Sequence, residues 1–506
     1  MGWIIFILFI VGWHVGLYGM FKKAGIEPWK ALIPFYNTWH IVKLCGIKKF
    51  WFWMQLIPIA GQFVTIWITI IFVMHFGKFT LWEHILTVFV PFIYLPYLGF
   101  SEGVRWGGPE VVKIYKKSSA REWIDAAVFA VVAATLIRTF VFEAYVIPTG
   151  SMEKTLMIND FLFVNKMSYG PRIPQTPISF PFVHNTLPFS STAPSYVKWI
   201  QLDYKRLPGF TEIKRNDVVV FNFPAGDTII NEPDYLSLRP YYDVLRSQYG
   251  GDRDKLFAEH DVIVHPMDKT DNYIKRCVGM PGDNIFIKEG RLYVNNQPAF
   301  VAPDAQSDYI VTVKTPFTNE YLRDVLGVKV TEDGPDDPDN FLPVAQNTFN
   351  INCTESMLAS LKTQPNVVTV EPNNEAVGTV NPQMFPFDSK NFPWNADNFG
   401  TLHIPKKGEV VTLNNNNMAL YRRVITTYEG NKLEENNGQY VINGKPSNTY
   451  TFKYNYYWMM GDNRHRSQDS RFWGFVPETH VVGKASLIWF SWNNGPRWKR
   501  IFKSIK

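Results

Sequence analysis

The chain changes character near residue 143, from long apolar stretches to short apolar runs separated by polar turns. Four apolar stretches come first, at residues 2–21, 51–74, about 82–101 and about 123–142. Each is close to the roughly 20 residues that a membrane-spanning helix needs, so the pattern predicts four such helices. Prolines (Pro58, Pro91 and Pro96) interrupt the second and third stretches. A pair of re-entrant hairpins there would give the same orientation, because it also crosses the membrane an even number of times.

Basic residues between these stretches indicate which side each loop faces. The loop at residues 22–50 carries six lysines against the single acid Glu27, and the loop near 102–122 carries five lysines and arginines. Loops rich in Lys and Arg stay on the cytoplasmic side, so the N-terminus and everything after residue 142 should lie outside. The first stretch has no basic segment before it and no small-residue cleavage site after it, so we expect it to be retained.

Beyond residue 143 the apolar residues occur in short runs bounded by turn residues, a pattern typical of β-strands. The clearest runs are residues 161–165, 217–223, 283–289, 291–296, 409–414, 439–444 and 480–492. Residues 297–455 are rich in Pro, Asn and Asp, which predicts a large inserted lobe of short strands and loops. The expected fold is therefore a set of membrane helices followed by a mainly β domain with an insertion. Its expected parts are a three-helix membrane region at 1–121, a fourth membrane helix at 122–143, core residues 144–296, the lobe at 297–455, and core residues 456–506 with the C-terminal tail.

Composition and charge exclude several classes of function. The net charge is +6, and the excess of Lys and Arg lies beside the apolar stretches rather than in one basic patch, so no nucleic-acid partner is expected. The three cysteines, Cys45, Cys277 and Cys353, have no metal-ligand spacing, so neither a zinc site nor a disulfide framework is expected. A single Cys277–Cys353 bridge is left open. We expect no metal and no organic cofactor.

A candidate nucleophile follows the last apolar stretch. Ser151 lies between Gly150 and Met152, where it can occupy an exposed turn whose backbone N–H groups point toward a substrate carbonyl. An ordinary turn beside the membrane explains these three residues equally well.

A serine hydroxyl is a weak nucleophile near neutral pH and needs a base within hydrogen-bond reach. The histidines have no triad-like neighbours, and surface or structural roles are expected for His260, His265, His403, His465 and His480. A lysine can serve instead if burial keeps it neutral. If the segment at 272–283 begins as a strand that the Pro281-Gly282-Asp283 turn ends, Tyr273, Lys275 and Cys277 would share one face while Arg276 pointed to the other, so Lys275 would lie among uncharged groups.

A second lysine is nearer in sequence, because Ser151-Met152-Glu153-Lys154 matches the S-x-x-K pattern of penicillin-binding proteins and β-lactamases. That pattern needs a helix to bring serine and lysine onto one face. The residues from 155 to 164 have the character of a strand, and neither S-D-N nor K-T-G occurs in the chain. We therefore favour Lys275 as the base.

A third polar segment, residues 461–477, contains charged residues and serines between apolar strands. Such a segment is costly to bury unless its members satisfy one another. Ser467 could hold Lys275 in position, and Asp469 and Arg471 could form an ion pair that supports the loop. A solvated loop with an ordinary surface pair is the alternative.

Together these segments resemble the bacterial type I signal peptidases, membrane-bound Ser/Lys endopeptidases that remove signal peptides from exported proteins. Residues 147–152 are similar to the family's nucleophile segment, 273–283 to its lysine segment, and 461–474 to its last segment. Residues 214–221 resemble a fourth, strand-forming segment, and the order also agrees. Asn216 stands where glycine is usual, and Cys277 where a small residue such as alanine is common.

The resemblance implies a role for each candidate. Ser151 would attack the scissile carbonyl, neutral Lys275 would accept its proton, and Ser467 would orient the lysine. The Ser151 backbone N–H and the Thr149 hydroxyl would form the oxyanion hole; Thr149 replaces a common serine but keeps a donor. The substrate would bind as an added strand, with shallow apolar pockets for small side chains shaped by Ile147, Met152, Val220 and Ile274.

We therefore expect a membrane-anchored serine endopeptidase of the bacterial plasma membrane, with its catalytic domain on the outer, periplasmic side. Its expected partners are preproteins with small-x-small cleavage sites and the lipid bilayer. The protein-export machinery is a further candidate partner. An inactive relative acting as a scaffold or binding module is an alternative, against which the joint presence of Ser151, Lys275 and Ser467 argues. A self-cleaving Ser/Lys regulator would need DNA-binding or cytoplasmic parts that this sequence lacks.

Overall fold

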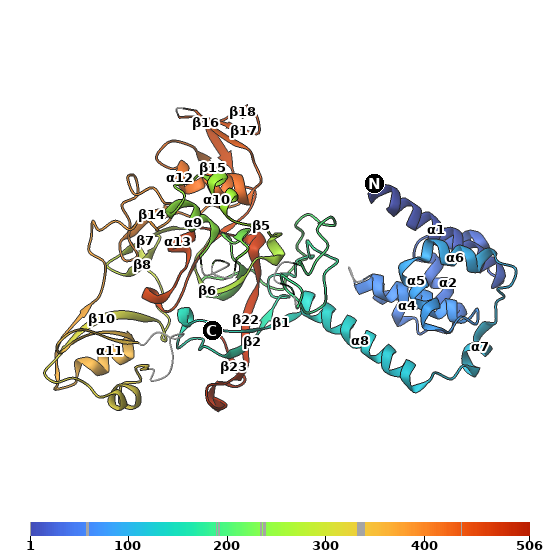
Figure 1. Cartoon of the computed structure of the whole chain (residues 1–506), viewed down its shortest axis with the longest axis horizontal. Helices are drawn as coiled ribbons and strands as arrows, with labels where there is room; N and C mark the ends of the chain where they lie inside the picture. The colour runs from blue at the N-terminus through green and yellow to red at the C-terminus, as the bar shows by residue number, and fades with distance from the viewer. Residues whose placement is uncertain are drawn as a thin grey trace. The chain divides into compact units, whose positions relative to one another are not determined.

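The computed structural model of the chain describes residues 2–56, 60–188, 190, 193–232, 235, 239–330, 340–436 and 438–506 (Figure 1). Pro58, which was expected to interrupt the second apolar stretch, lies outside them. Contacts divide the chain into two compact units, Met1–Leu136 and Ile137–Lys506. Each is described by itself.

The first unit is helical and has its own apolar core, which includes Leu17, Phe72 and Leu98. Its helices are α1 (Gly2–Lys23), α2 (Tyr36–Leu44), α3 (Phe50–Met54), α4 (Ala60–Met74), α5 (Leu81–Phe89), α6 (Pro91–Phe100), α7 (Gly108–Ile114) and the first part of α8 (Ser119–Phe140).

Glycines allow α1 and α6 to pack closely. A β-carbon added to Gly16 would lie 2.4 Å from Leu95 Cβ, and one added to Gly19 would lie 2.8 Å from Gly99 Cα. A side chain at either position would collide with α6, so the glycines allow the backbones of the two helices to approach closely.

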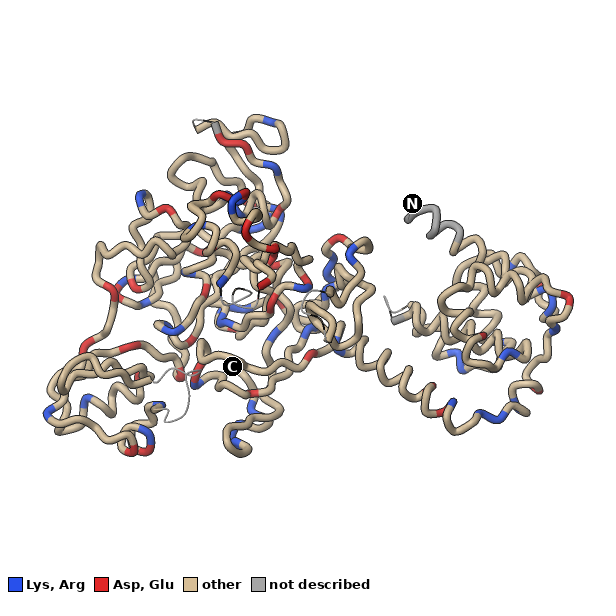
Figure 2. Tube along the Cα trace, in the orientation of Figure 1, with Lys and Arg blue, Asp and Glu red and all other residues tan. Residues whose placement is uncertain are grey.

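The expected count of four membrane helices is not confirmed. Among the described residues, α8 is long and apolar enough to cross a membrane, and α5 with α6 would make a second candidate only if that pair, bent by 117°, is one span. The bend occurs at Pro91, which has no N–H to continue α5 and instead begins α6. None of the side chains of α8 is buried, and its central turns carry no charged residue (Figure 2).

The second unit is mainly β, as the short apolar runs predict. Its central sheet has eight antiparallel strands in the order β1-β2-β22-β3-β6-β20-β21, with β23 paired to β22. Their bounds are Phe142–Val146 (β1), Asp160–Asn165 (β2), Val218–Asn222 (β3), Asn272–Gly279 (β6), Tyr456–Met460 (β20), Val476–Pro477 (β21), Val481–Ser491 (β22) and Lys503–Ser504 (β23). All seven predicted runs contain a strand of this unit.

Smaller sheets surround the central one. They are formed by β4 (Thr228–Ile230) with β5 (Val262–Val264); β7 (Asn284–Lys288), β8 (Arg291–Val294), β9 (Gln297–Pro298) and β14 (Phe399–His403); β15 (Val410–Thr412) with β19 (Thr449–Thr451); and β16 (Leu433–Asn436), β17 (Gln439–Ile442) and β18 (Lys445–Pro446). The described helices are α9 (Tyr241–Ser247), α10 (Arg253–Glu259), α11 (Glu355–Lys362), α12 (Met418–Arg423) and α13 (Ser470–Trp473).

The expected insertion at residues 297–455 is not a single lobe. Strands β10 (Gln306–Val313), β11 (Phe341–Ala345), β12 (Thr348–Thr354) and β13 (Val367–Pro372) form one sheet with a separate apolar core. We call residues 306–372 the β10–β13 lobe. Residues after 384 instead share a core with Val278 of β6 and Trp458 of β20. Polar turns give both parts the same composition, so the sequence did not separate them.

Strand β6 lies between β3 and β20 in the central sheet and positions the candidate base. Lys275 is paired with Val219 of β3, and the next residue, Arg276, is paired with Met460 of β20. The chain leaves β20 at Gly461, so the polar segment 461–471 begins beside Lys275.

Candidate active site

Ser151 lies in a single 3₁₀ turn, η2 (Gly150–Met152), which follows β1. The side chain of Asn463 donates from Nδ2 to the Gly150 carbonyl at 3.2 Å, and the Asn463 backbone N–H donates to the Ser151 carbonyl at 3.1 Å. These bonds fasten the turn to the segment that follows β20. Ser151 is largely buried, with 9% of its surface exposed.

Lys275 reaches this serine from β6. Its Nζ lies 2.7 Å from Ser151 Oγ, within hydrogen-bond distance, and 5.5 Å from the centre of the Tyr273 ring. The lysine is 3% exposed, and burial lowers its pKa from 10.5 to about 8, although Asp469 and Asp462 act in the opposite direction. A lysine with a pKa near 8 has a substantial neutral fraction in mildly alkaline solution, so it can accept a proton from the serine.

The ion pair predicted between Asp469 and Arg471 is present and fully buried. Arg471 donates from Nε and from one terminal nitrogen to the two oxygens of Asp469, each at 2.9 Å. Burial alone would raise the pKa of Asp469, but Arg471 and two backbone N–H donors hold that pKa below its ordinary value. One of these donors is Gly461 N–H, at 3.1 Å, so the pair holds the start of the polar segment.

Gly461 must be glycine because the chain is crowded there. A β-carbon at this position would lie 2.1 Å from Ser467 Oγ and 2.6 Å from the Ser151 carbonyl oxygen. The nucleophile turn and Ser467 therefore both lie against the face of Gly461 where a side chain would project.

A second buried ion pair was missed in the sequence. Arg276 donates to both oxygens of Asp462, at 2.8 and 2.7 Å, and Thr155 donates its hydroxyl to Asp462 at 2.6 Å. Arg276 does point away from Lys275, as the strand alternation predicts, but into this pair rather than toward solvent. A signal was available, because an arginine inside a strand of apolar residues needs a buried acid.

The predicted contact between Ser467 and Lys275 is not formed in this structure. The Ser467 hydroxyl is buried and has no hydrogen-bond partner within the described part of the chain. Thr149 is exposed with an extended backbone (φ −134°, ψ 157°) directly before the turn. Lys154 points away from Ser151 and donates to the Gly327 carbonyl at 2.8 Å.

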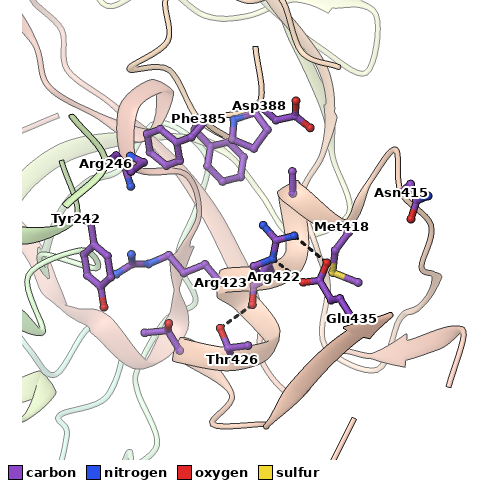
Figure 3. Close-up of a pocket in the computed structure, with 14 residues that line it drawn as sticks. Tyr242, Arg246, Phe385, Asp388, Asn415, Met418, Arg422, Arg423, Thr426 and Glu435 are labelled. Carbon is purple, nitrogen blue, oxygen red and sulfur yellow. Dashed lines mark hydrogen bonds and ion pairs between the residues drawn. The ribbon is translucent and has the colours of Figure 1, made fainter. Parts of the chain in front are cut away.

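The four residues predicted to shape substrate pockets lie in one apolar cluster. Ile147, Met152 and Val220 are buried in it, and Ile274 packs against it. Their side chains thus adjoin the turn that carries Ser151. A cavity of roughly 690 Å³ lies elsewhere in this unit, between Tyr242, Arg246, Phe385 and Arg422, and contains none of the candidate residues (Figure 3).

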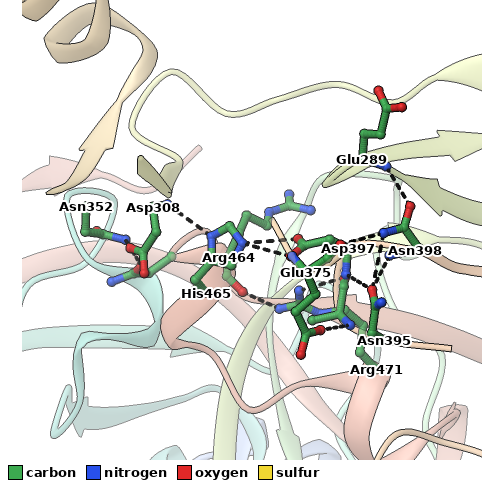
Figure 4. Close-up of polar contacts among 12 residues, drawn as sticks. Glu289, Asp308, Asn352, Glu375, Asn395, Asp397, Asn398, Arg464, His465 and Arg471 are labelled. Carbon is green, nitrogen blue, oxygen red and sulfur yellow. Dashed lines mark hydrogen bonds and ion pairs between the residues drawn. The ribbon is translucent and has the colours of Figure 1, made fainter. Parts of the chain in front are cut away.

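His465 is engaged by partners other than the nucleophile. Its Nδ1 accepts the Asp308 backbone N–H at 3.0 Å, and its Nε2 lies 3.1 Å from Asp397 Oδ1 (Figure 4). Both ring nitrogens are used, so this histidine has a structural role. Among the residues that the structure describes, no group of three or more His, Cys, Asp and Glu is arranged to hold a metal ion. The disulfide left open by the sequence is not formed: Cys277 on β6 and Cys353 on β12 are free thiols.

Comparison with known proteins identifies relatives for most of the chain. Residues 120–333 and 403–492 match the family described as signal peptidase, peptidase S26, and residues 29–109 match a family of unknown function. The chain is similar to signal peptidase I of Haemophilus influenzae, with 27% identity over 78% of this chain and 79% of the relative. Signal peptidase I of Buchnera aphidicola subsp. Schizaphis graminum is 24% identical, over 72% of this chain and 76% of the relative. That of Pseudomonas aeruginosa is 23% identical, over 72% of each.

Proposed function

The chain belongs to the signal peptidase family, peptidase S26, and from this premise we propose that Ser151 and Lys275 are its catalytic dyad. It is a serine endopeptidase that removes signal peptides from preproteins. The observation that carries the proposed dyad is the 2.7 Å contact between Lys275 Nζ and Ser151 Oγ, made by a lysine whose burial lowers its pKa to about 8.

In the proposed reaction, Ser151 Oγ attacks the carbonyl carbon before the scissile bond while Lys275 Nζ accepts the hydroxyl proton. The resulting ammonium then protonates the leaving amine, which becomes the N-terminus of the mature protein. A water molecule, activated in turn by neutral Lys275, hydrolyses the acyl-enzyme and releases the signal peptide. One lysine thus acts as base, then acid, then base again.

The negative charge that develops on the carbonyl oxygen needs preorganised donors. We assign this role to the Ser151 backbone N–H and the Thr149 hydroxyl, since Thr149 is exposed beside the turn. Asn463 holds the turn through the carbonyls of Gly150 and Ser151. Asp469 and Arg471 support the same loop through Gly461. Ser467 is buried against the same face of Gly461 as the Ser151 carbonyl, and we assign it the role of orienting Lys275 after rotation of its hydroxyl.

Substrate selection is proposed to depend on the apolar cluster beside the turn. Ile147, Met152, Val220 and Ile274 lie together in that cluster, and we assign them the shaping of shallow pockets that favour sites of the small-x-small type. The preprotein would bind in extended form along the site, as an added strand.

Membrane anchoring is proposed through α8, with further contributions from the apolar helices of the first unit. Lys113, Lys116 and Lys117 precede α8, which supports an orientation with that end on the cytoplasmic side and the peptidase unit on the outer, periplasmic side of the plasma membrane. Ser151 follows α8 after the single strand β1, so it would act close to the surface where a signal peptide leaves the bilayer. The protein-export machinery is the expected source of substrates.

Three single substitutions test the dyad. The full chain in detergent micelles is assayed for cleavage of a preprotein with an Ala-x-Ala site. Ser151→Ala and Lys275→Ala should each abolish processing, whereas Lys154→Ala should cleave like the unmodified chain because the Lys154 ammonium donates to the Gly327 carbonyl, away from Ser151. Full activity of Lys275→Ala would sink the proposed mechanism.

A further inference from the structure

The β10–β13 lobe bonds directly to the residues that surround the proposed dyad. Its contacts reach consecutive parts of the segment after β20: Gln306 N–H to the Asp462 carbonyl (2.8 Å), Asn352 Nδ2 to Asn463 Oδ1 (3.0 Å), Asp308 N–H to His465 Nδ1 (3.0 Å), and Asn340 Oδ1 from an Arg466 guanidinium nitrogen (2.8 Å). Figure 4 shows Asp308 and Asn352 facing His465. The lobe also has its own apolar core.

Asn340 joins the two catalytic segments through one side chain. Its Nδ2 lies 3.2 Å from both carboxylate oxygens of Glu153, while its Oδ1 accepts from Arg466. Glu153 belongs to the nucleophile segment, and Arg466 immediately precedes Ser467. An amide has donors and an acceptor on one planar group, so it can bridge a carboxylate to a guanidinium. Asn340 is completely buried, and Glu153 is 4% exposed.

Asn352 makes a second connection to the nucleophile turn. Its amide group donates to Asp308 Oδ1 at 2.6 Å and to Asn463 Oδ1 at 3.0 Å. Asn463 in turn donates to the carbonyls of Gly150 and Ser151. A continuous path of hydrogen bonds therefore runs from strand β12 to the backbone of the nucleophile. Asn352 and Asn463 are both buried, where an unsatisfied amide is costly.

The two asparagines lie in a part of the chain that the family match leaves out. The match ends at residue 333 and resumes at 403, so Asn340 and Asn352 fall between its two segments, whereas Glu153, Asn463 and Arg466 fall inside them. The contacts of Asn340 and Asn352 therefore come from a part of the lobe outside the family match, whereas the Glu153, Asn463 and Arg466 that they reach lie within it.

We propose that the β10–β13 lobe is a clamp on the catalytic centre, with Asn340 and Asn352 as positioning residues. The clamp fixes the spacing between the Ser151 turn and the loop that carries Ser467, and with it the 2.7 Å contact to Lys275. Displacement of reacting groups by about 1 Å can cost on the order of 100-fold in rate. The clamp rests on the dyad proposed above and acts through it, without touching the substrate.

The test uses an exchange of donor and acceptor. Asn340→Asp keeps the acceptor for Arg466 but places a second carboxylate against Glu153, so we expect kcat to fall about 10- to 100-fold with KM within about twofold. Adding Glu153→Gln to Asn340→Asp restores a donor and an acceptor across the contact, and kcat should return to within about threefold of the unmodified chain. The matched control is Asn347→Asp, the same change in the same lobe, where the Asn347 side chain donates to the Lys314 carbonyl within the lobe itself.

Each result of these assays either supports or overturns the proposed clamp. Unchanged kcat in Asn340→Asp overturns the clamp, and so does a loss that Glu153→Gln fails to restore, because the loss then reflects damage to the lobe. If Asn340→Asp does not fold, Asn340→Ala, which removes both contacts without adding charge, should show the same loss of kcat, and unchanged kcat in that variant also overturns the proposal. Ser151→Ala is assayed in parallel, since cleavage by that variant would refute the dyad itself whatever Asn340 does.

Discussion

Replacing Lys275 with methionine should abolish cleavage and at the same time stabilise the folded chain at neutral pH. Burial lowers the pKa of Lys275 from 10.5 to about 8. At about 1.36 kcal/mol per pKa unit, holding the charged ammonium in this site costs about 3 kcal/mol. Methionine has a similar length and no charge, so it removes this cost and loses only the hydrogen bond to Ser151, worth about 1 kcal/mol.

The sign of the pH dependence follows from the two pKa values. The pKa in the folded chain is the lower one, so the cost is fully present below pH 8 and disappears as pH rises toward 10.5, where the unfolded lysine also loses its proton. The net gain at pH 7 is therefore about 2 kcal/mol. For residues 137–506, with an unfolding entropy of roughly 0.8 kcal/mol/K, this is a rise in Tm of about 2–3 °C.

Differential scanning calorimetry of the full chain in micelles at pH 7 and pH 10 measures the effect, beside the cleavage assay. Lys154→Met is the control, because Lys154 is only partly buried and should change neither Tm nor cleavage. A lower Tm for Lys275→Met at pH 7, or a gain that is the same at both pH values, would refute the reasoning.

Three further predictions concern the same site. The value of kcat/KM should fall about tenfold per pH unit below pH 8 as Lys275 is protonated, and a flat profile from pH 9 to 5 would count against a lysine base. Gly461→Ala should lower kcat at least about 100-fold, because its methyl group would displace Ser467 and the Ser151 carbonyl. The control is Gly103→Ala, since an added β-carbon at Gly103 would have no neighbour within 4 Å. Equal activities of the two variants would contradict the claim that crowding at Gly461 matters for catalysis. Asp462→Asn should destabilise the peptidase unit by about 3–5 kcal/mol, measured as a fall in Tm, because Arg276 would stay buried without its acid. The control is Asp324→Asn, which breaks an exposed Arg–Asp pair and should leave Tm unchanged. Equal effects of the two substitutions would show that burial of the ion pair is not the cause.

Much of the β-rich unit was predictable because its apolar runs are short and bounded by turn residues. The strand alternation of β6 also put Lys275 and Arg276 on opposite faces correctly. The pairing of Arg276 with Asp462 was not predicted, since those residues are far apart in sequence and are joined only by the β6–β20 register. The division of residues 297–455 was also missed, because polar turns hide which apolar residues share a core.

The helical unit shows a different limit of sequence patterns. Length and apolar content predicted four spans, with re-entrant hairpins left open where prolines interrupt the second and third stretches. The third stretch forms two helices that meet at 117°, because Pro91 has no N–H to continue α5 and instead begins α6. Packing of α1 against α6 through Gly16 and Gly19 depends on contacts between distant segments, which hydropathy alone does not contain.

The most direct test of the dyad is the titration of Lys275 itself. The full chain labelled with ¹³C at lysine Cε is followed by NMR from pH 6 to 11, and the signal missing from Lys275→Met identifies the residue. We predict a pKa of about 8, coincident with the midpoint of the kcat/KM profile. A value near the ordinary 10.5, with activity unchanged at pH 7, would contradict Lys275 as the base that activates Ser151.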